Sequence, residues 1–360
     1  MGKKVFIAGG GTGGHFYPAL RMAEAFYEKG FEITYLGAEK GIEGRKDFPY
    51  GKKVLFDIRG VRGKGIKAKV FSSLELLKTA FKIKKLIEKE DIDFSLCFGG
   101  YASLPLGLAS VFSKVPLYIH EQNSIPSYTN KLLSVFAKKI FITFSYSKRF
   151  FPEKKTVFTG FPIRSSLKKS LSLPVSEAKS LIGVPIDKKN ILVFGGSQGA
   201  KKLTELAEYI AKENPDFHIT VITGKNSSLT ASLPNITSFD YFEDMGILYK
   251  SSDIVISRAG AGTVSEILLY GKFTIFIPYP YAASNHQYYN VKWLKDMGLA
   301  EVITEKDLSF KQINKLIKDF LSRENKKLIE AQIKSLSVKN AEEKILEEIL
   351  NDIEGRPETP

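Results

Sequence analysis

The stretch VFIAGGGTGGHFYPALRMAEAFYEKG, residues 5–30, decides the fold of this chain. Its four apolar residues at 5–8 predict a buried strand, and the glycine-rich run at 9–14 predicts a tight loop. A helical pattern then extends from Pro18 to Glu28 and stops at Gly30, with proline early and glycine just past the end, as is typical of helices. Strand, glycine loop and helix in this order open a doubly wound α/β domain.

The same order begins again near residue 191. The apolar run ILVF at 191–194 leads into GGSQG at 195–199, and a helical pattern follows from about Lys201 to Glu213. Further apolar strand candidates alternate with helix-length segments, as parallel sheets require. These candidates are residues 31–36, 93–98, 115–119, 139–143, 218–223, 253–257 and 273–277. We therefore expect two Rossmann-like, doubly wound α/β domains that face a cleft.

The domain boundary is expected near residue 162, where a Ser/Lys/Pro-rich stretch at 165–176 interrupts the periodicity. The N-terminal domain would span 1–162 and the C-terminal domain 163–335. Residues 336–360 would form an amphipathic helix that packs back on the first domain, followed by a frayed tail. The apolar face of that helix is formed by Ile345, Leu346, Ile349, Leu350 and Ile353.

Composition and charge narrow the class of protein. The 360 residues are 43% hydrophobic, enough for a folded core, and a single cysteine excludes an internal disulfide or a cysteine metal cluster. No apolar stretch approaches the roughly 18 residues of a membrane span, and the N-terminus does not resemble a signal peptide, so we expect a protein kept inside the cell. Residues 1–164 hold 28 basic and 14 acidic residues, whereas residues 165–360 are balanced. This excess predicts an anionic partner for the first half, either nucleic acid or an acidic membrane.

The first glycine loop fits a dinucleotide fingerprint at Gly9, Gly11 and Gly14, which alone is a weak signal. His15 is more informative, because a side chain at the mouth of such a loop faces the cleft. A histidine that only caps its own loop is the alternative.

A second anion cradle is predicted at AGAGTVSE, residues 259–266, after the strand at 253–257. If a pyrophosphate lies on the amides there, Glu266 is placed one turn further to accept hydrogen bonds from a ribose diol. A capping box from Thr263 to Glu266 is the alternative. Arg258, the loop at 195–199 and the cluster NHQYYN at 285–290 surround this segment and favour a nucleotide-sugar pocket. HEQN at 120–123 likewise places four polar side chains at a strand exit, with a plain polar turn as the alternative.

Residues 59–71 carry five cations and no acid, and lead to a capping-box helix start, Ser72-x-x-Glu75. Val70, Leu74, Leu77 and Phe81 recur at helical spacing, so this region is either a membrane-contact patch or a helix that faces the core. Periodicity alone favours the core. RNA binding is the weaker idea, because no aromatic residues are interleaved.

Taken together, the motifs resemble those of the MurG family. They occur in family order over nearly the whole chain, as GGGTGGH at 9–15, RGKG at 62–65, GGYAS at 99–103, HEQN at 120–123, GGSQGA at 195–200, Arg258, TVSE at 263–266 and HQ at 286–287. The resemblance implies an inverting GT-B glycosyltransferase that moves N-acetylglucosamine from UDP-GlcNAc to the 4-hydroxyl of undecaprenyl-pyrophosphoryl-muramoyl-pentapeptide. This step belongs to peptidoglycan synthesis, and thus to cell-wall growth, cell shape and division. Phe161 before Pro162 and Leu104 after Ser103 depart from the family's pattern.

The resemblance also implies site residues. The N-terminal domain would bind the acceptor and the membrane, and the C-terminal domain the donor, with no metal or other cofactor and no nucleic acid. Glu266 would hold the ribose, Phe242 the uracil region and Gln287 the sugar hydroxyls, while the other donor contacts would be Arg164, Ser197, Arg258, Ala261, Gly262, Thr263, Val264 and Ser265. The transferred sugar and the acceptor would face Thr12, Gly13, Gly14, His15 and Asn123. The membrane patch would comprise Arg62, Lys64, Lys67, Lys69, Val70, Leu74, Leu77 and Phe81, on a peripheral protein at the cytoplasmic face of the inner membrane.

His15 is our hypothesis for the general base, because a neutral imidazole near pH 7 can take the proton of the attacking hydroxyl. A helix N-terminus and Arg258 would stabilise the leaving UDP. Two alternatives stay open: a related GT-B transferase with another lipid or small acceptor, and a noncatalytic nucleotide- or nucleic-acid-binding protein.

Overall fold

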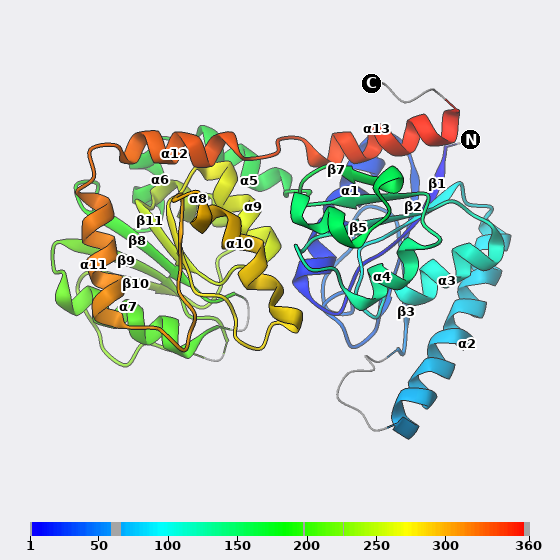
Figure 1. Ribbon diagram of the computed structural model, residues 1–360, viewed down its shortest axis with the longest axis horizontal. Coiled ribbons are helices and arrows are strands. Elements are labelled where there is room, and N and C mark those ends of the chain that lie inside the picture. Colours follow the sequence, from blue (N-terminus) through cyan, green and yellow to red (C-terminus); the bar gives the residue numbers. More distant parts are fainter. Residues whose placement is uncertain (1, 59–65, 197–198, 226, 356–360) are drawn as a thin grey trace. The chain divides into compact units, whose positions relative to one another are not determined.

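The computed structural model describes residues 2–58, 66–196, 199–225 and 227–355, and for residues 66–73 it describes the backbone alone. The chain divides into two compact units (Figure 1). Unit 1 combines residues 1–164 with residues 338–360, and unit 2 is residues 165–337. Each unit is built around one parallel sheet with helices, so the expected fold class of two Rossmann-like α/β domains is confirmed.

Unit 1 contains a seven-stranded parallel sheet of order β3-β2-β1-β4-β5-β6-β7. The strands are β1 (Lys4–Ala8), β2 (Glu32–Ala38), β3 (Lys52–Phe56), β4 (Phe94–Cys97), β5 (Leu117–Glu121), β6 (Lys139–Ile142) and β7 (Thr156–Phe158). The helices are α1 (Gly13–Glu28), α2 (Ile66–Glu90), α3 (Leu104–Ser113), α4 (Tyr128–Ser134) and α13 (Ala341–Glu354), with 3-10 turns η1 (Ser145–Phe150) and η2 (Glu153–Lys155). The strand order reverses between β1 and β4, which is where open α/β sheets bind ligands.

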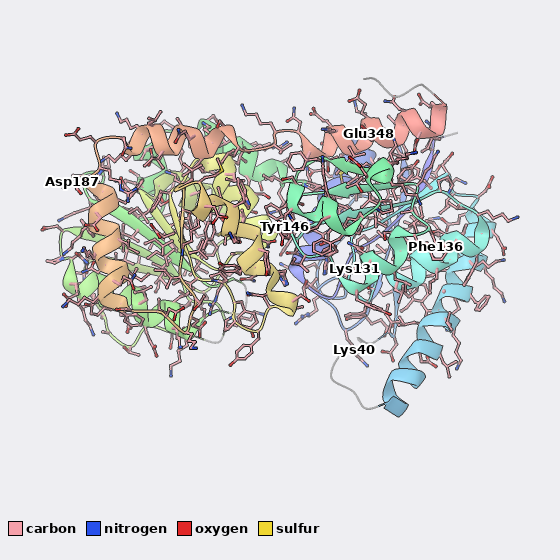
Figure 2. The ribbon with its side chains drawn as sticks, in the orientation of Figure 1. Lys40, Lys131, Phe136, Tyr146, Asp187 and Glu348 are labelled. Carbon is pink, nitrogen blue, oxygen red and sulfur yellow. The ribbon has the colours of Figure 1, made fainter. Side chains whose placement is uncertain are left out.

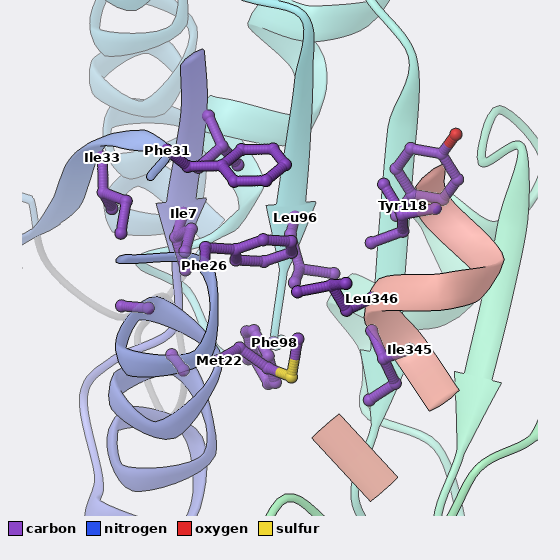
Figure 3. Packing of buried hydrophobic residues seen from close by; sticks show 14 of the residues in the cluster. Ile7, Met22, Phe26, Phe31, Ile33, Leu96, Phe98, Tyr118, Ile345 and Leu346 are labelled. Atoms are coloured by element: carbon purple, nitrogen blue, oxygen red, sulfur yellow. The ribbon is translucent and has the colours of Figure 1, made fainter. Parts of the chain in front are cut away.

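The core of unit 1 on the side of α1 joins residues from both ends of the sequence. Figure 3 shows Ile7 and Leu96 of adjacent strands packed with Phe26 of α1 and with Ile345 and Leu346 of α13. Ile349 of α13 is buried in the same cluster. The apolar face of the closing helix is therefore buried in unit 1, where its hydrophobic area stabilises that unit.

Unit 2 contains a six-stranded parallel sheet of order β10-β9-β8-β11-β12-β13, which reverses between β8 and β11. The strands are β8 (Lys189–Phe194), β9 (Phe217–Ile222), β10 (Ile236–Phe239), β11 (Ile254–Ser257), β12 (Thr274–Phe276) and β13 (Glu301–Val302). The helices are α5 (Ser165–Lys169), α6 (Val175–Leu181), α7 (Lys201–Glu213), α8 (Met245–Ser251), α9 (Ala261–Tyr270), α10 (His286–Asp296), α11 (Phe310–Leu321) and α12 (Lys326–Ser335), with turns η3 (Ser170–Ser172) and η4 (Ala283–Asn285).

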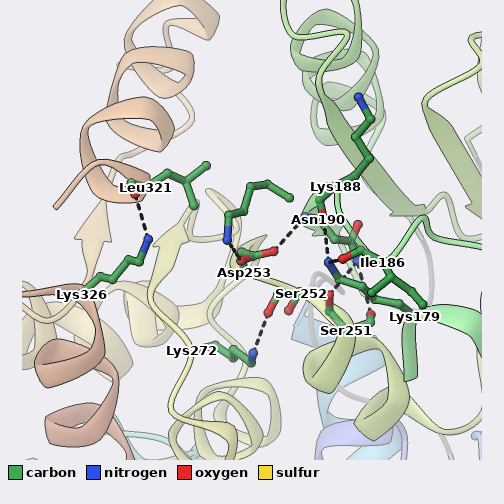
Figure 4. Close-up of polar contacts among 11 residues, drawn as sticks. Lys179, Ile186, Lys188, Asn190, Ser251, Ser252, Asp253, Lys272, Leu321 and Lys326 are labelled. Carbon is green, nitrogen blue, oxygen red and sulfur yellow. Dashed lines mark hydrogen bonds and ion pairs between the residues drawn. The ribbon is translucent and has the colours of Figure 1, made fainter. Parts of the chain in front are cut away.

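The amino ends of the unit 2 strands are joined by polar contacts (Figure 4). Asp253 accepts from the backbone of Asn190 at 2.9 Å and pairs with Lys189 at 3.0 Å. Lys272 donates to the Ser252 carbonyl at 2.6 Å, and burial lowers the pKa of Lys272 to about 8. These contacts fix one end of the sheet, so the loops that can vary for ligand binding are at the other end.

Two expected helix starts are wrong. The first helix begins at Gly13, five residues before Pro18, because the Thr12 carbonyl already accepts from the amides of His15 and Phe16 at 3.2 and 3.1 Å. The helix expected from Ser72 begins at Ile66, so Ser72 lies inside the helix and not at its start. Among the residues that the structure describes, no helix is long and apolar enough to cross a membrane.

Candidate functional site

The predicted site residues of unit 1 lie on three loops that leave neighbouring strands at the same edge of the sheet. The glycine loop follows β1, the GGYAS segment at 99–103 follows β4, and the HEQN segment at 120–123 ends β5. Because β1, β4 and β5 are adjacent and parallel, these loops come together at the point where the strand order reverses. Gly100 has a φ of +75°, and its backbone passes so close to the glycine loop that a Cβ there would lie 2.6 Å from the Gly10 carbonyl oxygen.

The glycine loop encloses a carboxylate of the protein itself. Glu43 is fully buried, and its two oxygens accept from the Gly11 amide at 2.9 and 3.1 Å and from the Ala38 amide at 2.9 Å. A Cβ at Gly10 would lie 2.1 Å from Glu43 Oε1, so only glycine fits there. The dinucleotide fingerprint is therefore misleading, because the Gly11 amide that would cradle a phosphate already holds an internal anion.

His15 is half-buried in the first turn of α1, and its ring lies against the loops after β4 and β5. Its Nδ1 is 3.0 Å from Oε1 of Gln122. A Cβ at Gly100 would lie 3.1 Å from the Cδ2 atom of His15, so glycine also leaves room for this ring. Gln122 and Gly100 both belong to predicted motifs, which places the histidine ring at the strand exits rather than in a self-contained cap.

The HEQN segment does not present four side chains to a cleft as expected. His120, Glu121 and Gln122 are buried, and His120 and Glu121 still belong to β5. Glu121 accepts from the amides of Asn123 and Ser127 at 2.9 and 3.0 Å, and burial raises its pKa above the ordinary value. The expectation is wrong because hydrogen-bonding side chains also serve as internal supports where a chain turns sharply. Asn123 alone of the four is half-buried rather than buried.

The other expected residues of unit 1 surround the start of α1. Thr12 and Gly14 are exposed and Gly13 is partly exposed, so the first turn of α1 is open to solvent. Arg164 lies with its guanidinium carbon 5.1 Å from the ring centre of Tyr17, one turn along α1. The structure thus brings Arg164 to the same helix end as His15.

In unit 2 the corresponding loops follow β8, β11 and β12, at the reversal of that sheet. The loop after β11 leads directly into α9, whose first intrahelical bond runs from the Val264 amide to the Gly260 carbonyl at 2.9 Å. Of the described residues, none caps this helix with a side chain. The amides of Ala261, Gly262 and Thr263 therefore form an anion-binding first turn. Ser197, expected to join them, lies outside the described residues.

Two of the expected pyrophosphate residues contribute nothing polar to that turn. Val264 is buried and uses its amide within α9, and the Ser265 hydroxyl donates to the Ala261 carbonyl at 2.9 Å. The alternative of a capping box is wrong as well, because Gly260 is the N-cap and Thr263 lies inside the helix.

Glu266 is one turn further along α9. Its Oε2 accepts from the hydroxyl of Tyr249 at 2.9 Å, and Tyr249 is fully buried beneath it. A carboxylate held at one oxygen by a rigid donor keeps the lone pairs of its other oxygen in a fixed direction. Tyr249 was not anticipated from the sequence, because no motif marks its position five residues before β11.

Arg258 and Gln287 are both bonded to the backbone. Arg258 donates to the Ile277 carbonyl at 3.1 Å and to Glu305 at 2.5 Å, so its charge is paired within the protein. Gln287 Oε1 accepts from the amides of Ala259 and Tyr279 at 3.2 and 2.8 Å. With the oxygen engaged twice, the group that Gln287 can offer to a ligand is its NH₂ donor. Glu305 is a second residue that sequence reasoning missed.

Phe242 lies three residues past the end of β10, at the same edge of the sheet, and it is half-buried. Its ring packs edge-on against Phe239, with centroids 4.8 Å apart and an interplanar angle of 67°. The expected donor residues other than Ser197 and Arg164 therefore lie on loops or first helical turns that follow the carboxyl ends of the unit 2 strands.

The expected membrane patch is described only in part. Arg62 and Lys64 lie outside the described residues, as do the side chains of Lys67, Lys69 and Val70. Leu74, Leu77 and Phe81 are exposed by 52%, 40% and 55%, so the prediction that this stripe faces the core is wrong. Another face of α2 packs inward instead, through Leu76, Ala80, Ile83 and Ile87. Phe81 also stacks on the exposed ring of Phe112 in α3, with centroids 5.5 Å apart.

Comparisons with known proteins match both units. The glycosyltransferase family 28 N-terminal domain matches residues 5–142, and the family 28 C-terminal domain matches residues 190–349. A protein of Sulfurihydrogenibium sp. (strain YO3AOP1), named UDP-N-acetylglucosamine–N-acetylmuramyl-(pentapeptide) pyrophosphoryl-undecaprenol N-acetylglucosamine transferase, is 53% identical over 98% of this chain and 99% of its own length. A protein of Aquifex aeolicus (strain VF5) with the same name is 40% identical over 96% and 99%. The crystal structure of Acinetobacter baumannii MurG is similar with a TM-score of 0.78 at 29% identity, covering 97% of this chain and 99% of its own.

Two parallel α/β units of this topology, with these matches, define a glycosyltransferase of the GT-B fold. The identity to the two named transferases extends over almost every residue of each chain, well beyond a shared fold. The chain belongs to the MurG family.

Proposed function

We propose that this protein transfers N-acetylglucosamine from UDP-GlcNAc to the 4-hydroxyl of undecaprenyl-pyrophosphoryl-muramoyl-pentapeptide, a step of peptidoglycan synthesis. The observation that carries the proposal is the uncapped first turn of α9 with Glu266 held one turn further, because together they match a pyrophosphate and a ribose. The names of the full-length relatives supply the donor sugar and the acceptor.

The donor is assigned to unit 2. The amides of Ala261, Gly262 and Thr263 bind the pyrophosphate, and Glu266 accepts from the ribose hydroxyls. Gln287 donates to a hydroxyl of the sugar, and Phe242 flanks the uracil. Arg258, already paired with Glu305, orients the loop rather than adding a free charge.

The acceptor is assigned to unit 1, with His15 as the general base. The 4-hydroxyl oxygen of the acceptor forms a bond to the anomeric carbon while the bond from that carbon to the UDP phosphate breaks. The hydroxyl proton goes to His15, and the negative charge that develops on UDP is stabilised by the first-turn amides of α9. Thr12, Gly13 and Gly14 immediately precede His15, and Asn123 lies on the loop after β5; we assign these four residues to the acceptor and Arg164 to the donor.

The acceptor carries a lipid, so we assign the exposed stripe of α2 to the anionic cytoplasmic surface of the inner membrane. Exposed Lys78, Lys82 and Lys85 lie within a turn of Leu77 and Phe81 on α2, and each cation near such a surface contributes about 1 kcal/mol. Lys131 on α4 is also exposed, and Phe136 in the turn after α4 is 51% exposed (Figure 2). Apolar side chains ringed by lysines are typical of proteins that bind one leaflet without crossing it.

UDP release tests the assignment. The protein is incubated with UDP-GlcNAc, with and without the muramoyl-pentapeptide lipid, in magnesium and again in EDTA. We expect release only with the acceptor, and release that survives EDTA, since the α9 amides stabilise the leaving group. Tight UDP binding without release would instead favour a GT-B transferase with another acceptor, and release from His15→Ala at the wild-type rate would exclude His15 as the base.

A further inference from the structure

A chain of hydrogen bonds links His15 to the backbone of unit 1. It begins at the Gly160 carbonyl, which lies 3.0 Å from Nε2 of His120. A carbonyl oxygen only accepts, so Nε2 of His120 carries a hydrogen. His120 is fully buried between Phe98 and Phe161, with ring centroids 5.4 and 6.4 Å away. Burial lowers the pKa of His120 to about 4, which keeps the ring neutral and leaves Nδ1 as an acceptor.

The next link is the amide of Gln122, which is also buried. Its Nε2 lies 3.2 Å from the His120 Nδ1 and 3.0 Å from the His120 carbonyl oxygen. Both partners are acceptors, so this end of the side chain is the NH₂ group. The reversed amide would set its oxygen against a carbonyl oxygen, an unfavourable contact inside a protein. The orientation of Gln122 is therefore determined.

The last link reaches His15. With the Gln122 NH₂ group directed at His120, the Oε1 of Gln122 faces Nδ1 of His15 at 3.0 Å. An amide oxygen only accepts, so Nδ1 of His15 must donate. We propose that Gln122, oriented by His120, is a positioning residue that holds His15 in the tautomer protonated at Nδ1, so that Nε2 is the basic nitrogen.

This inference rests on the proposed function, in which His15 removes the acceptor proton. A base protonated on the wrong nitrogen presents an N–H to the hydroxyl and cannot accept its proton, whatever its pKa. The Nε2 and Cδ2 edge of the ring lies toward Gly100, where a Cβ would come within 3.6 Å of Nε2. Protonation at Nδ1 therefore leaves Nε2 as the basic nitrogen, on the edge of the ring that lies beside Gly100, a residue without a side chain.

The test compares Gln122→Leu with Asn130→Leu. Asn130 is a matched control, because its buried amide also donates to the His120 carbonyl at 3.0 Å but continues to Glu121 instead of His15. Gln122→Leu is expected to lower kcat by about 10²-fold, the usual contribution of a positioned base, with the KM for UDP-GlcNAc unchanged. Asn130→Leu is expected to lose much less activity in the folded protein.

The tautomer itself is read by NMR. Long-range ¹⁵N–¹H correlations of protein labelled in its four histidines distinguish Nδ1–H from Nε2–H rings, and the His15 signal is the one absent from His15→Ala. We expect the Nδ1–H pattern in the wild type and in Asn130→Leu, and its loss in Gln122→Leu.

Two results would overturn the inference: an Nδ1–H pattern and wild-type kcat in Gln122→Leu, or an equal loss in Asn130→Leu. Failure of the proposed function is a different outcome, since His15→Ala would then turn over like the wild type. If His15→Ala is inactive while Gln122→Leu stays active with the His15 tautomer unchanged, His15 remains the general base and only the role of Gln122 is refuted.

Discussion

Arg21 in α1 donates to Glu342 in α13 at 2.8 Å, and this buried pair joins segments 321 residues apart in the sequence. Glu342→Gln removes the charge but keeps the shape, and it leaves the buried guanidinium paired with the more exposed Glu24 at 3.1 Å. We expect unit 1 to lose up to about 3 kcal/mol of stability. Glu24→Gln, the control, should cost under about 1 kcal/mol because Glu24 is near the surface. Hydrogen exchange of β1 amides measures the difference, since the single tryptophan, Trp293, is in unit 2.

Acid should weaken unit 1 through His120. The folded pKa of about 4 lies below the ordinary value of 6.5, so between these values the unfolded chain binds the proton more readily. Stability is fully present above pH 6.5 and falls as the pH drops toward 4, by about 2 kcal/mol between pH 7 and 5. Glu121 beside it has a raised pKa and acts in the opposite direction, so the comparison must be with His120→Gln. The difference in free energy between wild type and variant should shrink by that amount at pH 5; a constant difference would contradict the prediction.

Gly14→Ala and Gly10→Ala should have different effects on the stability of the protein. A Cβ at Gly14 would make an ordinary van der Waals contact with the Thr12 hydroxyl oxygen at 3.8 Å, so Gly14→Ala should leave stability unchanged or raise it by roughly 0.5–1 kcal/mol through helix propensity. Its catalytic rate should still fall, since the new methyl group occupies the acceptor position. Gly10→Ala must displace Glu43 and should cost about 1–3 kcal/mol. Thermal unfolding and turnover of both variants separate the two effects.

Tyr249→Phe tests how Glu266 is held. The variant keeps the buried ring and removes only the hydroxyl that donates to Glu266. We expect a KM for UDP-GlcNAc about tenfold higher, equivalent to about 1.4 kcal/mol, with kcat little changed. Tyr270→Phe is the control, because Tyr270 packs on Tyr249 but donates to the Leu167 carbonyl. An equal rise in KM for both variants would mean that packing, rather than the hydroxyl, matters.

Membrane binding should depend on the exposed stripe of α2. Phe81→Ser and Leu77→Ser each remove apolar surface that is already outside the core, so folding should be unaffected. Cosedimentation with vesicles of phosphatidylglycerol and phosphatidylethanolamine should decrease, and more so at high salt. Leu181→Ser in unit 2, where the leucine is 58% exposed, is the control. Equal binding by all three variants would place the membrane surface elsewhere.

The strands that sequence analysis found and those it missed differ in their position within the sheets. All seven strand candidates and both strands before the glycine loops are interior strands, with mostly buried residues. The four that it missed, β3, β7, β10 and β13, are the two edges of each sheet. These edge strands are largely half-exposed, so they lack the continuous apolar run that identifies a buried parallel strand.

In the site, sequence reasoning found the loops but not what supports them. Glycine loops and strand exits are local patterns, so His15, Glu266 and Gln287 could be located by position alone. Glu43 and Tyr249 could not, because they reach the site through contacts between segments distant in the sequence. The HEQN segment was located, but the burial of its side chains was not predicted, for the same reason. His120 and Gln122 are buried by neighbouring strands and by the segment at Gly160, and no local sequence pattern indicates these contacts.

The passage of the chain from unit 1 to unit 2 and back sets an order on folding during synthesis. Unit 2 has all its residues once Ser337 has left the ribosome, whereas unit 1 still lacks Ile345, Leu346 and Ile349. Unit 1 is therefore begun first but completed after unit 2, and its apolar surface under α13 stays uncovered until α13 has been synthesised. Such a surface on a nascent chain is a target for chaperones, and Arg21 can pair there with Glu24 but gains Glu342 only after α13 has been synthesised.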